Sequence, residues 1–193
     1  MNTTIYIKSY KAPDVDVREA LRYAGMRAED EAVERELIAA YAEAMPVLSY
    51  RVCYVRLDVD APFVRRLIES SVSARERLCE ARSVIVFLAT VGVGIDRLIA
   101  RAAVGSPARA LLFDAIGAER VEALCDEFCR EMAKECAQKS ITRRFSPGYG
   151  DISLEFQRDI FELLDGHRSI GVALCDSLLM SPSKSVSAII GVK

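Results

Sequence analysis

A continuous apolar run, SVIVFLA from Ser83 to Ala89, limits the choice of fold more than any other segment. Strands with one solvated face alternate apolar and polar side chains, whereas strands covered on both faces carry apolar side chains in succession. With its glycine-containing continuation to Ile95, the stretch is still shorter than the roughly 20 apolar residues that a membrane-spanning helix needs. The run therefore predicts a buried strand that is covered on both sides.

The length of 193 residues, 51% of them hydrophobic, fits one folded domain. A chain of this size removes about 70% of its unfolded surface from water, so neither disulfides nor a metal are needed to hold a core. The sequence contains no internal repeat and no linker rich in Gly, Ser or Pro. We predict a single domain over 1–193, with an N-terminal helical part over about 1–46.

Periodicity and turn residues divide the chain into helices and strands. A Ser73–Glu76 pair has capping-box spacing, and Gly117 is a candidate break in a long helix. Predicted helices cover 16–25, 29–45, 62–68, 73–79, 93–103, 107–138 and 153–164. Predicted strands cover 47–59, 83–89, 170–175 and 186–192, the last two paired with each other around Pro182.

The charge balance argues against nucleic acid as the partner. Lys and Arg number 26 against 28 Asp and Glu, a formal net charge of −2, so the chain lacks the positive field that a phosphate backbone attracts. The first residues show no basic region followed by an apolar run, so we expect no secretory signal, no membrane association and a cytoplasmic location.

The six cysteines fit reduced thiols in a core. No C-x-x-C pair occurs, and Cys125, Cys129 and Cys136 follow the apolar stripe of one predicted helix. Three thiols without a fourth ligand make a poor structural zinc site. We therefore expect core packing rather than metal ligation.

Two weaker patterns have both a functional and a structural interpretation. Gly92 and Gly94 lie between a strand and a helix, where backbone N–H groups can face a phosphate, but Arg97 replaces the third glycine of a dinucleotide motif. The two glycines therefore have two interpretations, a tight structural turn or the phosphate site of a nucleotide-binding enzyme. His167, the only histidine, comes close to the D-x-H-x-x-G pattern of a cobalt-ligating histidine, with Ile170 at a glycine position; the alternative is a solvated loop.

The loop RFSPGY, from Arg144 to Tyr149, has the residue types of a ligand-binding turn. Proline fixes the backbone, glycine permits a sharp turn, and tyrosine offers a ring and a hydroxyl. A guanidinium can hold a carboxylate through two parallel hydrogen bonds. A rigid structural turn is an equally good interpretation of these residue types alone.

A resemblance to a known family favours the ligand-binding interpretation of this loop over the purely structural one. R-x-x-x-G-Y at Arg144, Gly148 and Tyr149 precedes a second set, with Leu163, Leu164 and Asp165 between the two. The second set is Leu174, Ser177, Met180, Pro182, Ser185, Val186 and Ser187. Over about residues 140–190 the chain resembles the activation domain of cobalamin-dependent methionine synthase. The resemblance implies an α+β fold, with helices packed on a mainly antiparallel mixed sheet.

In that family the domain binds S-adenosylmethionine and supports the reductive remethylation of oxidised cobalamin. The resemblance implies that Arg144 holds the ligand's carboxylate, and that Pro147, Gly148 and Tyr149 shape the loop around it. It also implies a stand-alone reactivation subunit, with the cobalamin carried by a separate methionine synthase or other corrinoid protein and a flavodoxin-like protein as electron donor.

The chain departs from the family pattern at Gly150 and Asp151, where Gly-Tyr-Pro and then Cys-Pro are usual, and at Ser181, where tryptophan is common. These departures leave a second hypothesis open. The chain could be a non-catalytic binding or assembly partner of a corrinoid methyltransferase that no longer binds S-adenosylmethionine.

Overall fold

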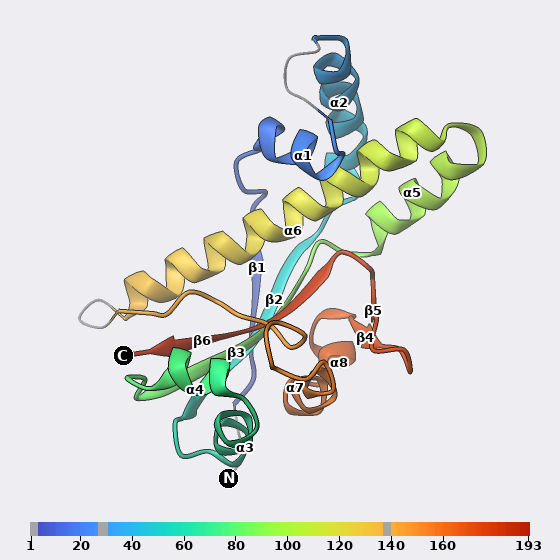
Figure 1. Cartoon of the computed structure of the whole chain (residues 1–193). Coiled ribbons are helices and arrows are strands. Elements are labelled where there is room, and N and C mark those ends of the chain that lie inside the picture. Colours follow the sequence, from blue (N-terminus) through green and yellow to red (C-terminus); the bar gives the residue numbers. More distant parts are fainter. Residues whose placement is uncertain (1–3, 27–30, 137–139) are drawn as a thin grey trace.

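A four-stranded sheet separates two groups of helices in the computed structural model, which describes residues 4–26, 31–136 and 140–193 (Figure 1). The strand order is β1-β2-β3-β6, and every neighbouring pair is antiparallel. The strands are β1 (Tyr6–Tyr10), β2 (Tyr50–Asp58), β3 (Ser83–Thr90) and β6 (Ser185–Val192). The α+β class and the antiparallel sheet agree with the prediction.

The central strand β3 is buried on both faces, as its sequence predicts. Ile85 and Phe87 belong to one core cluster, whereas Val84 and Val86 belong to the other. The first cluster is covered by α1 (Val17–Tyr23), α2 (Glu31–Ala44), α5 (Val93–Gly105) and α6 (Pro107–Glu135). The second is covered by α3 (Pro62–Ser70), α4 (Val72–Leu78), α7 (Phe156–Leu164) and α8 (Gly166–Ile170). The sheet is therefore the middle of three layers.

The long helix α6 crosses one face of the sheet without interruption, so the predicted break at Gly117 is wrong. A Cβ at Gly117 would lie 2.8 Å from Lys184 Cγ and 3.1 Å from Ile95 Cγ1. Gly117 therefore lets α5 and the residue before β6, Lys184, pack closely against α6. It does not end the helix. Among the described helices, none is long and apolar enough to span a membrane.

The N-terminal part is not wholly helical, because the chain begins its described structure with the edge strand β1. This strand pairs with β2 in the register Lys8↔Val52. The ammonium of Lys8 also lies 2.8 Å from Glu131 and 2.9 Å from Glu135 of α6. These contacts fasten the edge strand to the long helix.

The predicted pairing of the two C-terminal strands is also wrong. β6 pairs with β3, in the register Val86↔Ile189, and is buried along nearly its whole length. The predicted strand at 170–175 contributes only β4 (Ala173–Leu174), which forms a small separate hairpin with β5 (Met180–Ser181). An apolar strand such as β6 buries more surface in the main sheet than beside a two-residue partner.

The N-cap of helix α4 is Ser71, two residues before the predicted capping serine Ser73. The Oγ of Ser71 accepts a hydrogen bond from the N–H of Ala74 at 3.0 Å and caps the helix. The N–H of Ser73 instead donates to the carboxylate of Asp151 at 3.1 Å. A side chain from the loop after residue 144 therefore completes the start of this helix.

Candidate functional site

A groove of about 1080 Å³ runs between α6, the segment before and within α1, and the loop 141–149; we call it the α6 groove. The charged side chains that line it are Asp14, Asp16, Glu19, Arg22, Arg77, Glu119, Glu122, Asp126, Glu127, Arg130, Arg143 and Arg144. Its other lining includes the ring of Tyr149 and the thiol-bearing residue Cys129. Carboxylates outnumber guanidinium groups here, so the groove favours a ligand that carries positive charge.

The loop that forms one wall is fastened to the edge of β6. The N–H of Thr142 donates to the carbonyl of Gly191 at 2.8 Å, and Phe145 exchanges two backbone hydrogen bonds with Ile189, of 3.1 and 2.8 Å. The side chain of Phe145 is buried in the core cluster beside α4 and α7. The loop therefore leaves the sheet at a fixed place, with the side chain of Arg144 directed into the groove.

The turn that follows brings Tyr149 to the same groove. Pro147 is buried, and Gly148 adopts a φ of +87°, which non-glycine residues rarely do. The N–H of Gly148 donates to the carbonyl of Ile152 at 2.9 Å and closes the turn. Tyr149 stands at its tip with 70% of its surface exposed. A ring so placed is available to stack on a ligand.

Arg144 is held by two carboxylates of α6. Its Nη1 pairs with Asp126 and its Nη2 with Glu122, and its side chain is 22% exposed. Although burial acts against the charge, the hydrogen bond with Asp126 and the nearby negative charges raise the pKa of the guanidinium. Arg144, Glu122 and Asp126 thus form a compact cluster that can receive a group with both a carboxylate and a cation.

The structure brings two of the four predicted site residues, Arg144 and Tyr149, to the lining of one groove. Pro147 and Gly148 shape the turn and do not line it. The acidic wall is not among the residues predicted from the sequence, because the apolar stripe is the dominant pattern of α6. The i,i+4 spacing of Glu122 and Asp126 places both on one helix face and could have indicated them.

A buried charged network fixes the opposite wall. Glu119 and Arg120 are 2% and 0% exposed and pair with each other. Arg120 donates to the carbonyls of Pro13 and Asp14, both at 2.7 Å, and Tyr41 donates to Glu119 at 2.8 Å. This network ties the segment before α1 to α6, and so sets the width of the groove.

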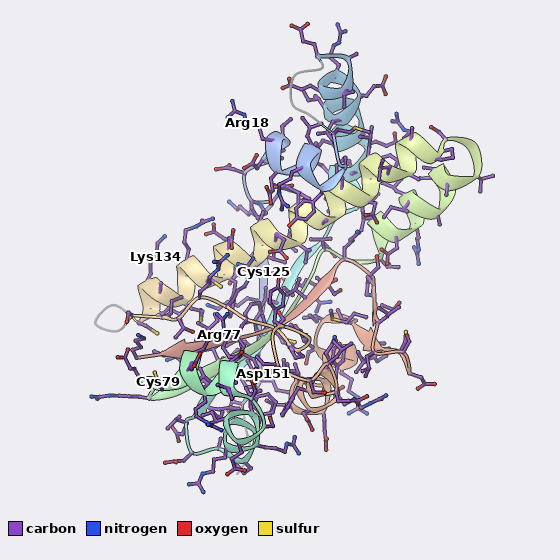
Figure 2. All side chains as sticks on the ribbon, in the orientation of Figure 1. Arg18, Arg77, Cys79, Cys125, Lys134 and Asp151 are labelled. Carbon is purple, nitrogen blue, oxygen red and sulfur yellow. The ribbon has the colours of Figure 1, made fainter. Side chains whose placement is uncertain are left out.

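In the cysteine cluster on and after α6, Cys125 and Cys136 are buried, as predicted, and Cys129 is half-buried, whereas Cys79 and Cys175 elsewhere are exposed. All six cysteines are free. Cys125 of α6 lies in the hydrophobic core, and this burial raises the pKa of its thiol well above the usual range. Cys125 lies on α6 and Cys79 beside α4, on different elements (Figure 2). Within the described residues, no group of three or more His, Cys, Asp or Glu could hold a metal ion.

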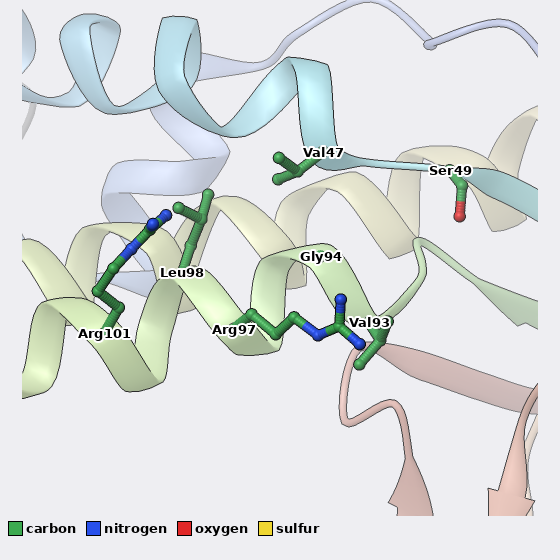
Figure 3. A pocket seen from close by; sticks show the side chains of 7 residues that line it. All are labelled: Val47, Ser49, Val93, Gly94, Arg97, Leu98 and Arg101. Atoms are coloured by element: carbon green, nitrogen blue, oxygen red, sulfur yellow. The ribbon is translucent and has the colours of Figure 1, made fainter.

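The Gly92–Gly94 turn is explained by packing. A Cβ at Gly94 would lie 2.1 Å from the carbonyl oxygen of Val47, and one at Gly92 would lie 2.3 Å from the Oγ of Ser49. A shallow cavity of about 560 Å³ lies beside the turn, lined by Arg97 and Arg101 along with apolar side chains (Figure 3). Gly94 is therefore explained by the close approach of α5 to the segment before β2, and Gly92 by its φ of +83° in a tight turn, as the structural interpretation predicts.

Replacing Gly94 tests this packing. We expect Gly94→Ala to destabilise the fold by about 1–3 kcal/mol, since the new methyl group meets a backbone carbonyl that cannot rotate away. Gly105→Ala is the matched control on the same helix, because no atom lies within 4 Å of a Cβ there. Equal unfolding midpoints in urea for the two variants would contradict the packing explanation.

His167 does not belong to the groove. It lies exposed on α8, a short helix where the sequence predicts a solvated loop, and is absent from the groove lining. Among the described residues, His167 belongs to no group of three or more His, Cys, Asp or Glu that could hold a metal ion, so its position adds nothing to the cobalt-ligand interpretation.

Comparisons with known proteins identify the fold. A family model described as "Vitamin B12 dependent methionine synthase, activation domain" matches residues 80–193, more than half of the chain. The solved structure titled "Crystal Structure of the MetH Reactivation Domain bound to AdoHcy" aligns with a TM-score of 0.67 and 14% sequence identity, over 97% of this chain and 78% of that one. No curated protein matches the sequence.

Proposed function

This chain belongs to the family of the activation domain of vitamin B12-dependent methionine synthase, and from that premise we propose that it binds S-adenosylmethionine in the α6 groove. The observation that carries the proposal is the convergence of Arg144 and Tyr149 on one groove whose other wall is acidic. The related reactivation domain was solved with AdoHcy bound, which supports a ligand of the same type here.

The charges of the groove complement those of the ligand. S-adenosylmethionine has one carboxylate and two cations, an ammonium and a sulfonium. The ligand's carboxylate can accept two parallel hydrogen bonds from the guanidinium of Arg144 and so displace Glu122 and Asp126 from it. The ligand's ammonium can then pair with Glu122 or Asp126. The groove volume of about 1080 Å³ is sufficient for a ligand of this size.

The remaining groups fit the nucleoside. Tyr149 offers an exposed ring against which adenine can stack, and the turn at Gly148 leaves its face open. In this proposal Pro147 and Gly148 hold the turn and Arg144 and Tyr149 contact the ligand. The two contacts, on either side of a stiff bend, fix the ligand's orientation.

The reaction needs little from the protein beyond orientation. S-adenosylmethionine, when bound, supplies a methyl group on a cationic sulfur, and transfer to a strongly nucleophilic acceptor requires alignment and exclusion of water but no proton shuttle. The described residues that line the groove include no histidine. The charged side chains of the groove are therefore assigned to binding and orienting the ligand.

We infer further that the acceptor is cobalamin carried by a separate methionine synthase or other corrinoid protein in the cytoplasm. A flavodoxin-like protein would be the electron donor. The exposure of Tyr149 at the mouth of the groove supports this arrangement, because a docked partner can then approach the ligand directly.

Calorimetric titration tests the proposed ligand. We expect S-adenosylmethionine and S-adenosylhomocysteine to bind, and 5′-methylthioadenosine, which lacks the amino-acid tail, to bind much more weakly. The difference isolates the cluster of Arg144, Glu122 and Asp126. Absence of heat with S-adenosylmethionine at millimolar concentration would contradict the proposal.

A non-catalytic assembly role is the second candidate, and one observation favours it. Arg144 already has two carboxylate partners within the chain, so it does not need a ligand to satisfy its charge. A reconstituted remethylation assay with a cobalamin-carrying partner separates the two roles. The assembly role predicts a stable complex without methyl transfer.

A further inference from the structure

We propose that Asp151 is a positioning residue for the ligand site: its carboxylate clamps the turn that carries Tyr149 onto the start of α4. This inference rests on the proposed function, because the ligand of the site is S-adenosylmethionine only if that function holds. It concerns a position where the chain departs from the family pattern, which makes Asp151 a feature of this chain.

The clamp consists of three hydrogen bonds to one carboxylate. Oδ1 of Asp151 accepts from the Oγ of Ser71 at 2.7 Å and from the N–H of Ser73 at 3.1 Å. Oδ2 accepts from the N–H of Val72 at 2.7 Å. The first N–H groups of a helix have no partner within it, and a negative charge there is favourable. Consistent with this, the hydrogen bonds from Ser71 and Ser73 hold the pKa of Asp151 below its usual range.

Asp151 is well placed to control Tyr149. The two residues share one turn, which the N–H of Ile152 closes by donating to the carbonyl of Tyr149 at 3.0 Å. Pro147 and Ile152 are buried at its ends, whereas Gly148, Tyr149 and Gly150 are exposed. Apolar burial therefore anchors the ends of the turn but not its tip.

No other side-chain hydrogen bond in the described chain joins the turn 147–152 to another element. Backbone hydrogen bonds, among them Tyr149 N–H to the carbonyl of Ser146 at 3.2 Å, shape the turn, and the Asp151 carboxylate is the side-chain group that fixes its direction relative to α4. A mobile tip would have to be ordered each time the ligand bound, and that ordering reduces affinity.

A second contact between α4 and the loop supports this arrangement. The guanidinium of Arg77 lies over the ring of Phe145, 5.6 Å from its centroid, and Arg77 lines the α6 groove. Arg77 belongs to α4, and Asp151 lies beside this helix (Figure 2). Helix α4 and its N-cap thus contact the loop before the turn, at Phe145, and within the turn, at Asp151.

The absence of tryptophan from the sequence permits a direct test. Tyr149→Trp introduces a single tryptophan at the tip, which is excited at wavelengths where the remaining tyrosines do not absorb, and its anisotropy decay is compared with and without Asp151→Asn. The matched control is Ser106→Ala, which removes a similar helix cap, at the start of α6, where Ser106 Oγ accepts from the N–H of Arg109 at 3.3 Å. In parallel, S-adenosylmethionine is titrated into Asp151→Asn and Ser106→Ala with Tyr149 retained.

We expect Asp151→Asn to increase the amplitude of fast local motion of the indole and to weaken S-adenosylmethionine binding about tenfold, whereas Ser106→Ala changes neither. Unchanged motion, or increased motion with unchanged affinity, would overturn the inference. If the wild-type protein binds no ligand, the proposed function fails, and the fluorescence comparison alone then decides whether Asp151 holds the turn.

Discussion

Arg144→Ala should weaken S-adenosylmethionine binding by at least about 10-fold, because charge-assisted hydrogen bonds that fix a carboxylate contribute about 1.5–3 kcal/mol. The loss should be larger than the guanidinium alone provides. Without Arg144, the carboxylates of Glu122 and Asp126 would face the carboxylate of the ligand and repel it. Arg144→Lys keeps the charge but not the planar fork, so we expect an intermediate affinity.

The matched control is Arg158→Ala. Arg158 is another ion-paired arginine of the same region, bonded to Glu155 and outside the α6 groove. This variant should bind S-adenosylmethionine as the wild type does. Unfolding midpoints should change little for both variants, since each replaced arginine pairs with partly exposed carboxylates. Wild-type affinity in Arg144→Ala would contradict the assignment of the carboxylate site.

Arg120→Met should destabilise the protein by about 3–5 kcal/mol, because it leaves the buried carboxylate of Glu119 without its cation. It also removes the hydrogen bonds to the carbonyls of Pro13 and Asp14. The free energy of unfolding in urea measures the loss. Adding Glu119→Leu to Arg120→Met should recover part of it, since the double variant no longer buries an unpaired charge.

Arg130→Ala provides the comparison on the same helix. Arg130 pairs with Glu127 at the surface, and exposed pairs of this kind contribute about 0–1 kcal/mol. Arg120→Met should therefore destabilise the protein far more than Arg130→Ala does. Equal losses would contradict the conclusion that the Glu119–Arg120 network supports this wall of the groove.

Local patterns in the sequence predicted the central elements well. The apolar run of β3 and the apolar stripe of α6 are each legible within one segment, because each element is buried along its own length. Strand β1 was missed although it has the aromatic and β-branched residues of a strand: it is short, and its partner β2 comes only after two helices. The pairing of β6 with β3 depends on sheet order, which local periodicity does not contain.

The candidate site was only half predictable for the same reason. Arg144 and Tyr149 lie in one loop whose residue types and family resemblance indicate a ligand. Glu122 and Asp126 come from a helix that precedes this loop. The carbonyls of Pro13 and Asp14 come from a segment that is distant from the loop in sequence. The network that holds Arg120 unites residues that share no motif, so only the folded chain reveals it.

A crystal structure of this protein grown with S-adenosylhomocysteine tests the central claim most directly. We expect the ligand's carboxylate at the guanidinium of Arg144, its ammonium at Glu122 or Asp126, and its adenine beside the ring of Tyr149. A map in which Arg144 still pairs with both carboxylates and the α6 groove holds no nucleoside, at ligand concentrations that saturate related domains, would contradict it.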